Sequence, residues 1–187
     1  MIGIDKKIYE WSSQEWLKIS EMEISLEREM REQLLRDVVD KAFVYEFYVY
    51  EYERRKRMSA RGIQWDRCKI SSEQLKQLWS EIFAADINTA ERLEIDYQQY
   101  LWHMFSYRKK VALEGQVARQ KFNQVKKSDV YIFYNSLEET YLVTGSENLR
   151  DVDFDEEQDI YVIDINNKWT YINTHESAFG PYFYQLI

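Results

Sequence analysis

The sequence predicts an α+β fold: a long N-terminal helix or helices, then a helical segment packed on a small, mostly antiparallel C-terminal sheet. Two observations carry this prediction. Large apolar residues recur every three or four positions over 26–52, as they do on one face of a helix. Residues 129–187 instead hold short runs rich in Val, Ile, Tyr and Trp between polar turn residues, which is typical of strands and hairpins.

Length and composition fit one domain with a helical extension. The 187 residues are 45% hydrophobic and 16% aromatic, which is ample for a packed core, and five Gly and one Pro leave no room for long linkers. A connector around Gly62 divides the chain, so we predict a helical extension over 1–65 and an α+β domain over 66–187. Cys68 is the only cysteine, which excludes an intramolecular disulfide and a cysteine-based zinc site.

The N-terminal region is predicted to be helical. A short helix is expected within residues 1–20, and no Gly or Pro interrupts the pattern from Glu21 to Arg57. Residues 42–52 are apolar or aromatic on nearly all sides and also suit a strand, but their helix-forming flanks favour a helix. Such a surface has to be covered, either by the sheet or by a second copy of the chain, so a homodimer through the N-terminal helix is one possibility. The apolar stripe consists of Leu26, Met30, Leu34, Val38, Ala42, Tyr45, Val49 and Tyr52.

The basic run at residues 54–57 closes this predicted helix. Cations at a helix C-terminus interact favourably with the helix dipole, so the run needs no ligand to explain it. A phosphate-binding patch is the weaker interpretation, because the protein as a whole carries a net charge of −8. Nucleic acid is therefore not expected as the main partner.

Three further helices and several strands follow. Ser71 with Gln74, and Asn88 with Glu91, have the spacing of capping boxes and predict helices beginning at these positions, the second extending to about Phe105. A third helix is expected over about 114–124. In the sheet, two Asn residues at 166–167 predict a tight two-residue hairpin turn, because Asn tolerates positive φ. Both faces of the predicted strands carry apolar residues, so helices should cover at least one face.

Acidic residues concentrate in the predicted sheet region. Residues 129–187 carry 12 Asp or Glu against only Arg150 and Lys168 as cations. This imbalance favours a basic protein as partner, steered by complementary charge and anchored by nearby Tyr or Trp side chains. The expected partner-binding residues are Asp151, Asp153, Asp155, Glu156, Glu157 and Asp159.

The first three of these acidic residues have the spacing that begins a calcium-binding EF-hand loop. However, the sixth position of that loop requires Gly and here is Glu156, and the twelfth requires a bidentate Glu and here is Val162. We therefore predict a solvated acidic loop, no metal site and no cofactor.

The chain has two histidines. His103 lies among apolar residues of a predicted helix, where a hydrogen-bonded structural histidine is expected. His175 stands beside Glu176 at a strand end, where it could serve as a general base. No nucleophile, metal cluster or phosphate loop accompanies this pair in the sequence, so we assign no catalytic residue and keep a hydrolase using His175 and Glu176 as the alternative.

The second part of the chain contains a set of residues that together resemble one protein family. They are residues 101–107, 112–115, Ala118, 122–123, 131–134, 159–164, 169–171, 174–176 and 180–183. The family is one of small cytosolic proteins from Gram-positive bacteria, a domain of unknown function. The resemblance covers about residues 70–187 and implies a fold neighbourhood without assigned catalytic residues. Some small cytosolic proteins of this general kind are immunity proteins, which bind and silence a toxin made by the same cell.

These observations together predict a non-catalytic, acidic binding module. We expect an immunity-like or antitoxin-like protein that neutralises a cationic toxin, such as a nuclease, by binding it. The N-terminus lacks the apolar run of a signal peptide and no stretch is long enough to span a membrane, so we expect a cytoplasmic protein without a membrane partner. A homodimeric scaffold is the remaining alternative.

Overall fold

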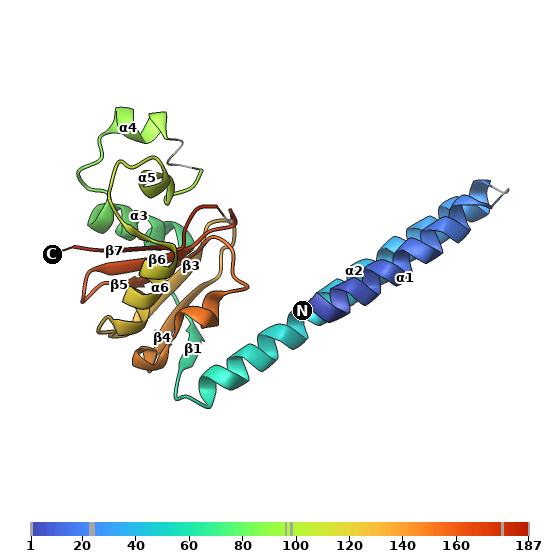
Figure 1. Ribbon diagram of the computed structural model, residues 1–187, viewed down its shortest axis with the longest axis horizontal. Helices are drawn as coiled ribbons and strands as arrows, with labels where there is room; N and C mark the ends of the chain where they lie inside the picture. The colour runs from blue at the N-terminus through green and yellow to red at the C-terminus, as the bar shows by residue number, and fades with distance from the viewer. Residues whose placement is uncertain (1, 23–24, 96, 98, 177, 187) are drawn as a thin grey trace. The chain divides into compact units, whose positions relative to one another are not determined.

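The computed structural model describes residues 2–22, 25–95, 97, 99–176 and 178–186. It divides the chain into two compact units, residues 1–57 and 58–187. The α+β prediction is confirmed. Two N-terminal helices come first, and further helices then pack on an antiparallel sheet (Figure 1).

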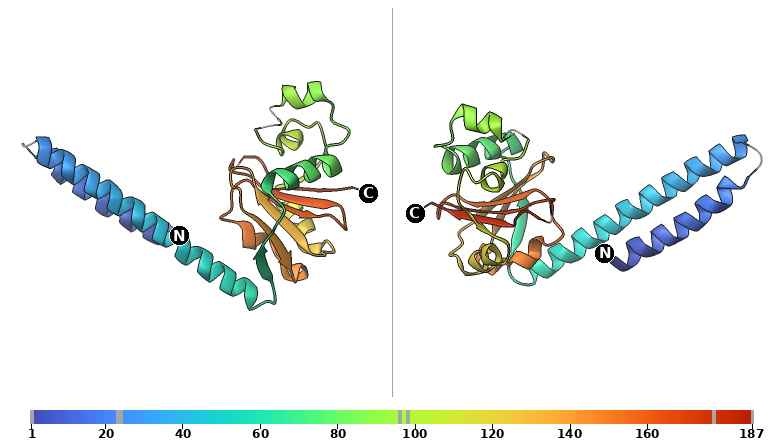
Figure 2. Two further views of the ribbon diagram at one scale, coloured as in Figure 1. Left: turned by 180° about the vertical axis from the view of Figure 1, so that it is seen from behind. Right: turned by 45° about the horizontal axis from the view of Figure 1, so that its top comes forward.

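The first unit is a helical hairpin. Helix α1 (Ile2–Ser20) lies along the first part of the 35-residue helix α2 (Ser25–Ser59), which continues beyond it (Figure 2). Ile19 and Leu35 are buried, and the Arg36 guanidinium lies 4.8 Å from the centre of the Trp16 ring. Helix α2 is continuous through residues 42–52, so the helical interpretation of this aromatic segment is correct. The apolar stripe predicted from the spacing is largely exposed, because α1 packs against a different side of α2.

The second unit is built on a seven-stranded sheet in the order β1-β4-β3-β5-β6-β7-β2, in which every neighbouring pair is antiparallel. Its strands are β1 (Gln64–Arg67), β2 (Leu113–Glu114), β3 (Val130–Tyr134), β4 (Thr140–Thr144), β5 (Ile160–Asp164), β6 (Trp169–Asn173) and β7 (Tyr182–Gln185). Its helices are α3 (Ser72–Phe83), α4 (Thr89–Glu94), α5 (His103–Ser106) and α6 (Gly115–Gln124), with short 3₁₀ helices η1 (Ser146–Asn148) and η2 (Asp151–Phe154).

Helices cover both faces of this sheet (Figure 2). Every residue of β5 is buried, and its side chains alternate between two cores, as the two-residue repeat of a strand requires. Tyr161 and Ile163 belong to the core under α3, together with Trp79, whose indole donates to the Thr170 hydroxyl at 2.9 Å. Val162 belongs to the other core, under α6 and η2. This double burial explains why the strands are apolar on both sides.

Both predicted capping boxes are present. The Gln74 amide donates to the Ser71 hydroxyl at 3.2 Å, and the Glu91 amide donates to the Asn88 side chain at 3.0 Å. The helix that begins after Asn88 is nevertheless much shorter than predicted, since α4 ends at Glu94 and α5 covers only four residues. Most of the described residues between α4 and α5 are buried. A helix with only one face on the core could not bury them, so tertiary burial overrides helix propensity in this segment. The buried residues of this region are Ile95, Tyr97, Leu101, Trp102, Met104 and Phe105.

Two strands and one turn differ from the sequence prediction. The region predicted to be a connector around Gly62 includes β1, which pairs with β4, and the unpredicted β2 pairs with β7. The β5–β6 hairpin is present, but its connection covers four residues, 165–168, and positive φ occurs at Lys168. The two-residue turn was therefore wrong. The buried Asp164 carboxylate accepts from the Asn167 backbone and side chain, each at 2.8 Å, and this Asx-type bonding stabilises the wider turn.

Candidate functional site

A cleft of about 450 Å³ opens where the ends of several elements of the second unit meet. Four segments form its walls: the segment after η2, the end of β6 with the residues that follow it, the segment before β7, and the N-terminal turns of α6. It is lined by Gly115, Gln116, Arg119, Asp155, Glu156, Glu157, Gln158, Asn173, Thr174, His175, Glu176, Phe179, Gly180 and Pro181.

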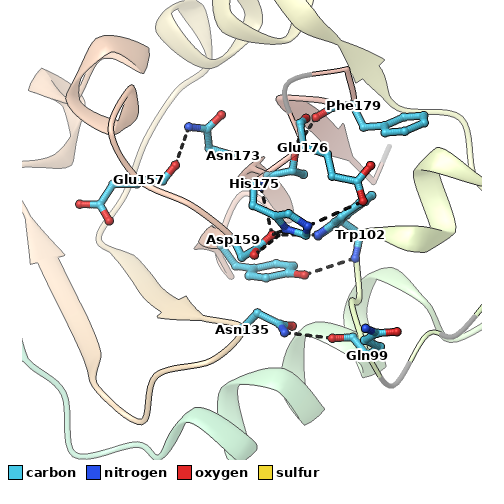
Figure 3. A network of polar contacts seen from close by, with 11 residues as sticks. Gln99, Trp102, Asn135, Glu157, Asp159, Asn173, His175, Glu176 and Phe179 are labelled. Atoms are coloured by element: carbon cyan, nitrogen blue, oxygen red, sulfur yellow. Dashed lines mark hydrogen bonds and ion pairs between the residues drawn. The ribbon is translucent and has the colours of Figure 1, made fainter. Parts of the chain in front are cut away.

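Asp159 fixes the histidine of this cleft (Figure 3). Its carboxylate accepts from the Trp102 indole at 3.1 Å, the His175 backbone amide at 3.3 Å and His175 Nδ1 at 2.8 Å. Residue 160 pairs with residue 173 across β5 and β6, which places the residue before β5 next to those after β6. With Nδ1 bonded to Asp159, the second ring nitrogen, Nε2, lies 3.7 Å from a Glu176 carboxylate oxygen.

Arg119 on α6 crosses to the acidic segment. Its guanidinium pairs with Asp155 and, at 3.2 Å, with Asp151. Partial burial disfavours the charged guanidinium, but the bond to Asp155 and the further contact with Asp151 outweigh this effect and raise the pKa of Arg119. Asn123 on the same helix face makes two hydrogen bonds to Asp151. Its side-chain N–H donates to the Asp151 carboxylate, and its side-chain oxygen accepts from the Asp151 backbone amide. Asp151 therefore anchors η2 to α6.

The six acidic residues predicted to bind a partner fall into two groups. Asp151, Asp153 and Asp159 bond groups of the fold itself; Asp153 accepts from the Arg150 amide and pairs with Arg61. Asp155, Glu156 and Glu157 line the cleft instead, and of these Asp155 shares Arg119 with Asp151. The charge that faces the cleft thus comes from the second half of the acidic run and from Glu176, which the prediction had placed only in a hydrolase.

The sequence model of one protein family, described as a domain of unknown function, DUF4275, matches residues 52–183. The chain belongs to this family. The match begins in the last turns of α2, earlier than the resemblance over 70–187 indicated, and takes in β1. No curated protein and no solved structure matched the chain.

The DUF4275 cleft has an aromatic neighbour. A second hollow of about 300 Å³ shares Glu176 and Phe179 with the first, and its remaining lining is Trp102, His103, Ser106 and Tyr107. His103 has the structural role expected of it, because its Nδ1 donates to the Ile95 carbonyl at 2.7 Å and its ring packs edge-on against Trp102. The site therefore combines an acidic hollow with an aromatic one, and Glu176 stands at both.

Residues outside the acidic run complete this site, and sequence reasoning missed them. Arg119, Asn123 and Trp102 are 32, 28 and 57 positions away from their Asp partners. No local motif marks such separations. The proximity of Asp159 and His175 was easier to predict from the sequence, since a hairpin between 160–165 and 168–173 brings the residues at its open end together.

None of the helices in the described ranges is long and apolar enough to cross a membrane.

Proposed function

We propose that the DUF4275 domain is a non-catalytic module that binds a basic protein through the acidic cleft and the aromatic hollow beside it. The observation that carries the proposal is the charge of the cleft. Among the described residues that line it, four carboxylates, those of Asp155, Glu156, Glu157 and Glu176, stand against a single Lys or Arg, Arg119. That cation is already paired with Asp151 and Asp155, so Glu156 and Glu176, both exposed, are the carboxylates best placed for an incoming cation.

The aromatic hollow supports the same partner chemistry. Lys and Arg side chains have an apolar stem and a cationic head, and aromatic rings attract the head through the negative face of the ring. Tyr107 and Phe179, both exposed, offer such rings beside Glu176, whereas Trp102 is buried beneath them. A partner that inserts a Lys or Arg side chain here gains a carboxylate and a ring together, while the surrounding negative charge accelerates its approach. Neutralisation of a cationic toxin, as immunity proteins achieve, is the specific form of binding that we propose.

The first prediction concerns the cleft carboxylates. The double variant Glu156→Gln/Glu176→Gln should weaken the binding of a basic partner about tenfold at low ionic strength, mainly through a slower association rate. The immobilised full-length chain would capture the partner from the native cell by salt-stepped elution, and surface plasmon resonance would then measure its Kd for each variant.

A charge-matched control separates the cleft from the net charge of the protein. Glu138→Gln/Glu139→Gln removes two exposed carboxylates from the β3–β4 connection, which lies outside the cleft. This control should retain the wild-type Kd within about twofold. Equal weakening by both double variants would reject the cleft as the binding site.

The Asp159–His175 pair supports a second candidate, a hydrolase in which His175 acts as general base. An acidic residue on Nδ1 orients the ring as in known acid–base pairs, and the ring lies on the cleft wall. Against this candidate, the adjacent Thr174 hydroxyl donates to the backbone carbonyls of Glu176 and Phe179 and is thus engaged within the loop.

The two candidates differ in how they respond to loss of the imidazole. His175→Asn removes the imidazole but keeps a polar side chain, and it should leave the Kd for a basic partner within about threefold, because the cleft carboxylates and not His175 attract the partner. A general base would instead lose about 100-fold or more in turnover when the same substitution is made. Retained binding with His175→Asn, measured beside the cleft variants, would favour the binding module.

A further inference from the structure

The most exposed apolar surface of the molecule lies on the helical hairpin. Of the 22 large hydrophobic side chains that are exposed among the described residues, 14 belong to residues 1–57. Seven of them follow one another along α2 at intervals of three, four or seven residues, with exposed fractions between 40% and 67%. We call them the α2 stripe; they are Leu26, Met30, Leu34, Val38, Tyr45, Val49 and Tyr52. Soluble monomers rarely expose a contiguous apolar patch of this extent.

Helix α1 leaves this stripe open. Leu35, which is 6% exposed, faces α1, whereas its neighbour Leu34 is 61% exposed. Successive residues of a helix point about 100° apart, so a side of α2 distinct from the one against α1 carries the stripe. Helix α2 continues beyond the end of α1 (Figure 2). In the second half of α2, Tyr45, Val49 and Tyr52 are exposed.

The spacing of the stripe is symmetric about a point between residues 41 and 42. Four residues of the stripe precede this point and three follow it. Apart from Leu26, whose mirror position is Arg57, they stand at matching distances, to within one residue at the outermost pair. The pairs are Val38 with Tyr45, Leu34 with Val49, and Met30 with Tyr52. In a two-fold interface, residue i of one copy meets residue j of the other, and j meets i. A pattern that maps onto itself on reversal therefore fits an antiparallel second copy of the same helix.

The charges at the ends of α2 select the same orientation. Residues 53–57 contain Glu53 followed by four cations, of which Arg54 is buried and the other three are accessible, whereas the segment that mirrors them, residues 26–30, contains two Glu and one Arg. Antiparallel packing sets the cationic segment of each copy against the acidic segment of the other. Parallel packing would set the two cationic segments side by side, which is unfavourable.

We infer that the α1–α2 hairpin is a homodimerisation element, in which the α2 stripes of two copies pack antiparallel. The area is sufficient. The stripe extends over about 40 Å of helix at 1.5 Å per residue. At roughly 100 Å² for each side chain, about half of what a buried aromatic ring covers, the two stripes bury roughly 1,400 Å². Stable protein interfaces bury about 1,200–2,000 Å². The resulting dimer presents two DUF4275 domains and hence two copies of the cleft.

Sedimentation equilibrium of the full-length chain tests the dimer. We expect twice the 22.9 kDa mass of the monomer at micromolar concentration. Val49→Glu should raise the dimer dissociation constant at least about 30-fold, because it introduces a charge into each half of the interface. Phe47→Glu is the matched control: Phe47 is 56% exposed on the same helix but points about 160° away from Val49, and it should change the constant less than about threefold. Far-UV circular dichroism verifies that both variants remain helical.

Cysteine pairing tests the orientation without relying on a destabilising substitution. In a Cys68→Ser background, mixed Leu34→Cys and Val49→Cys chains should form disulfide-linked dimers on mild oxidation, whereas Leu34→Cys alone should form few. A monomeric mass at about 100 μM, an unchanged dissociation constant for Val49→Glu, or efficient cross-linking of Leu34→Cys alone would each overturn the inference. A monomer would leave the stripe as the contact surface for a different protein.

Discussion

Replacing Gly145 by alanine should lower the free energy of unfolding of the DUF4275 domain by about 4 kcal/mol. Gly145 follows the last residue of β4 with a φ of +65°, where the chain leaves the strand opposite the start of β1. A Cβ atom at this position would lie 2.2 Å from the backbone carbonyl oxygen of Gly62. Since that atom belongs to the backbone, the clash can be relieved only by moving the turn that leads into β1.

Gly115 provides the control for this prediction. It has a similar φ of +56°, but no heavy atom from other parts of the chain lies within 4 Å of the position that its Cβ would take. Gly115→Ala should therefore cost only the strain of a left-handed alanine, about 1 kcal/mol. Urea unfolding of both full-length variants, followed by NMR through the backbone amide signals of β5, measures the difference between their free energies of unfolding. Similar losses for the two variants would show that backbone strain alone, and not the contact with Gly62, explains the effect.

Several helix starts and the central strands were predictable because their signals are local. The capping boxes at Ser71 and Asn88 and the apolar spacing in α2 each act within a few residues. Helices α3 and α4 begin directly after their cap residues, and α2 begins at Ser25, a turn later than the predicted Glu21. The strands β3 to β6 are apolar on both sides because two cores require it. Local patterns of this kind survive folding when the tertiary structure demands the same arrangement.

The edge strands of the sheet were not predictable, because their sequences have little strand propensity and they form only by pairing with a neighbouring strand. Strand β1 has four residues, of which only Trp65 is typical of strands, and it forms by pairing with β4. Likewise β2 has two residues and exists through its pairing with β7. Spacing also indicates that α2 has an apolar face without showing whether that face is buried, and here the face is open to solvent.

The candidate site was predicted in its chemistry more than in its residues. An acidic surface with aromatic neighbours was expected, and the cleft has both. Sequence cannot tell a carboxylate that faces solvent from one that satisfies a buried donor, since the two look alike until the donors are placed. Asp151 and Asp159 were assigned to a partner, whereas they bond Asn123 and Trp102 of the same chain.

Replacing Asp164 by alanine should lower the free energy of unfolding by about 3 kcal/mol at pH 7. This buried carboxylate accepts from the Ser128 amide and hydroxyl at 2.7 Å and from the Asn167 amide and side chain at 2.8 Å. It thus joins the start of β3 to the β5–β6 turn. Removing it leaves backbone donors without an acceptor, whereas Asp129→Asn, at an exposed position beside Ser128, should cost less than about 0.5 kcal/mol.

The acid dependence of stability tests the charge of Asp164 separately from its packing. Burial raises the pKa of Asp164, but the hydrogen bonds from Asn167 and Ser128 outweigh burial and lower the pKa below its usual value. Because the folded pKa is below the unfolded one, about 3.9, this carboxylate stabilises the fold fully above pH 4 to 5. That contribution is lost as the pH falls through the folded pKa. Asp164→Asn cannot titrate, so its melting temperature should decline less between pH 5 and pH 3 than that of the wild type, as differential scanning calorimetry would show. Parallel declines would mean that the hydrogen bonds at Asp164 do not depend on its charge.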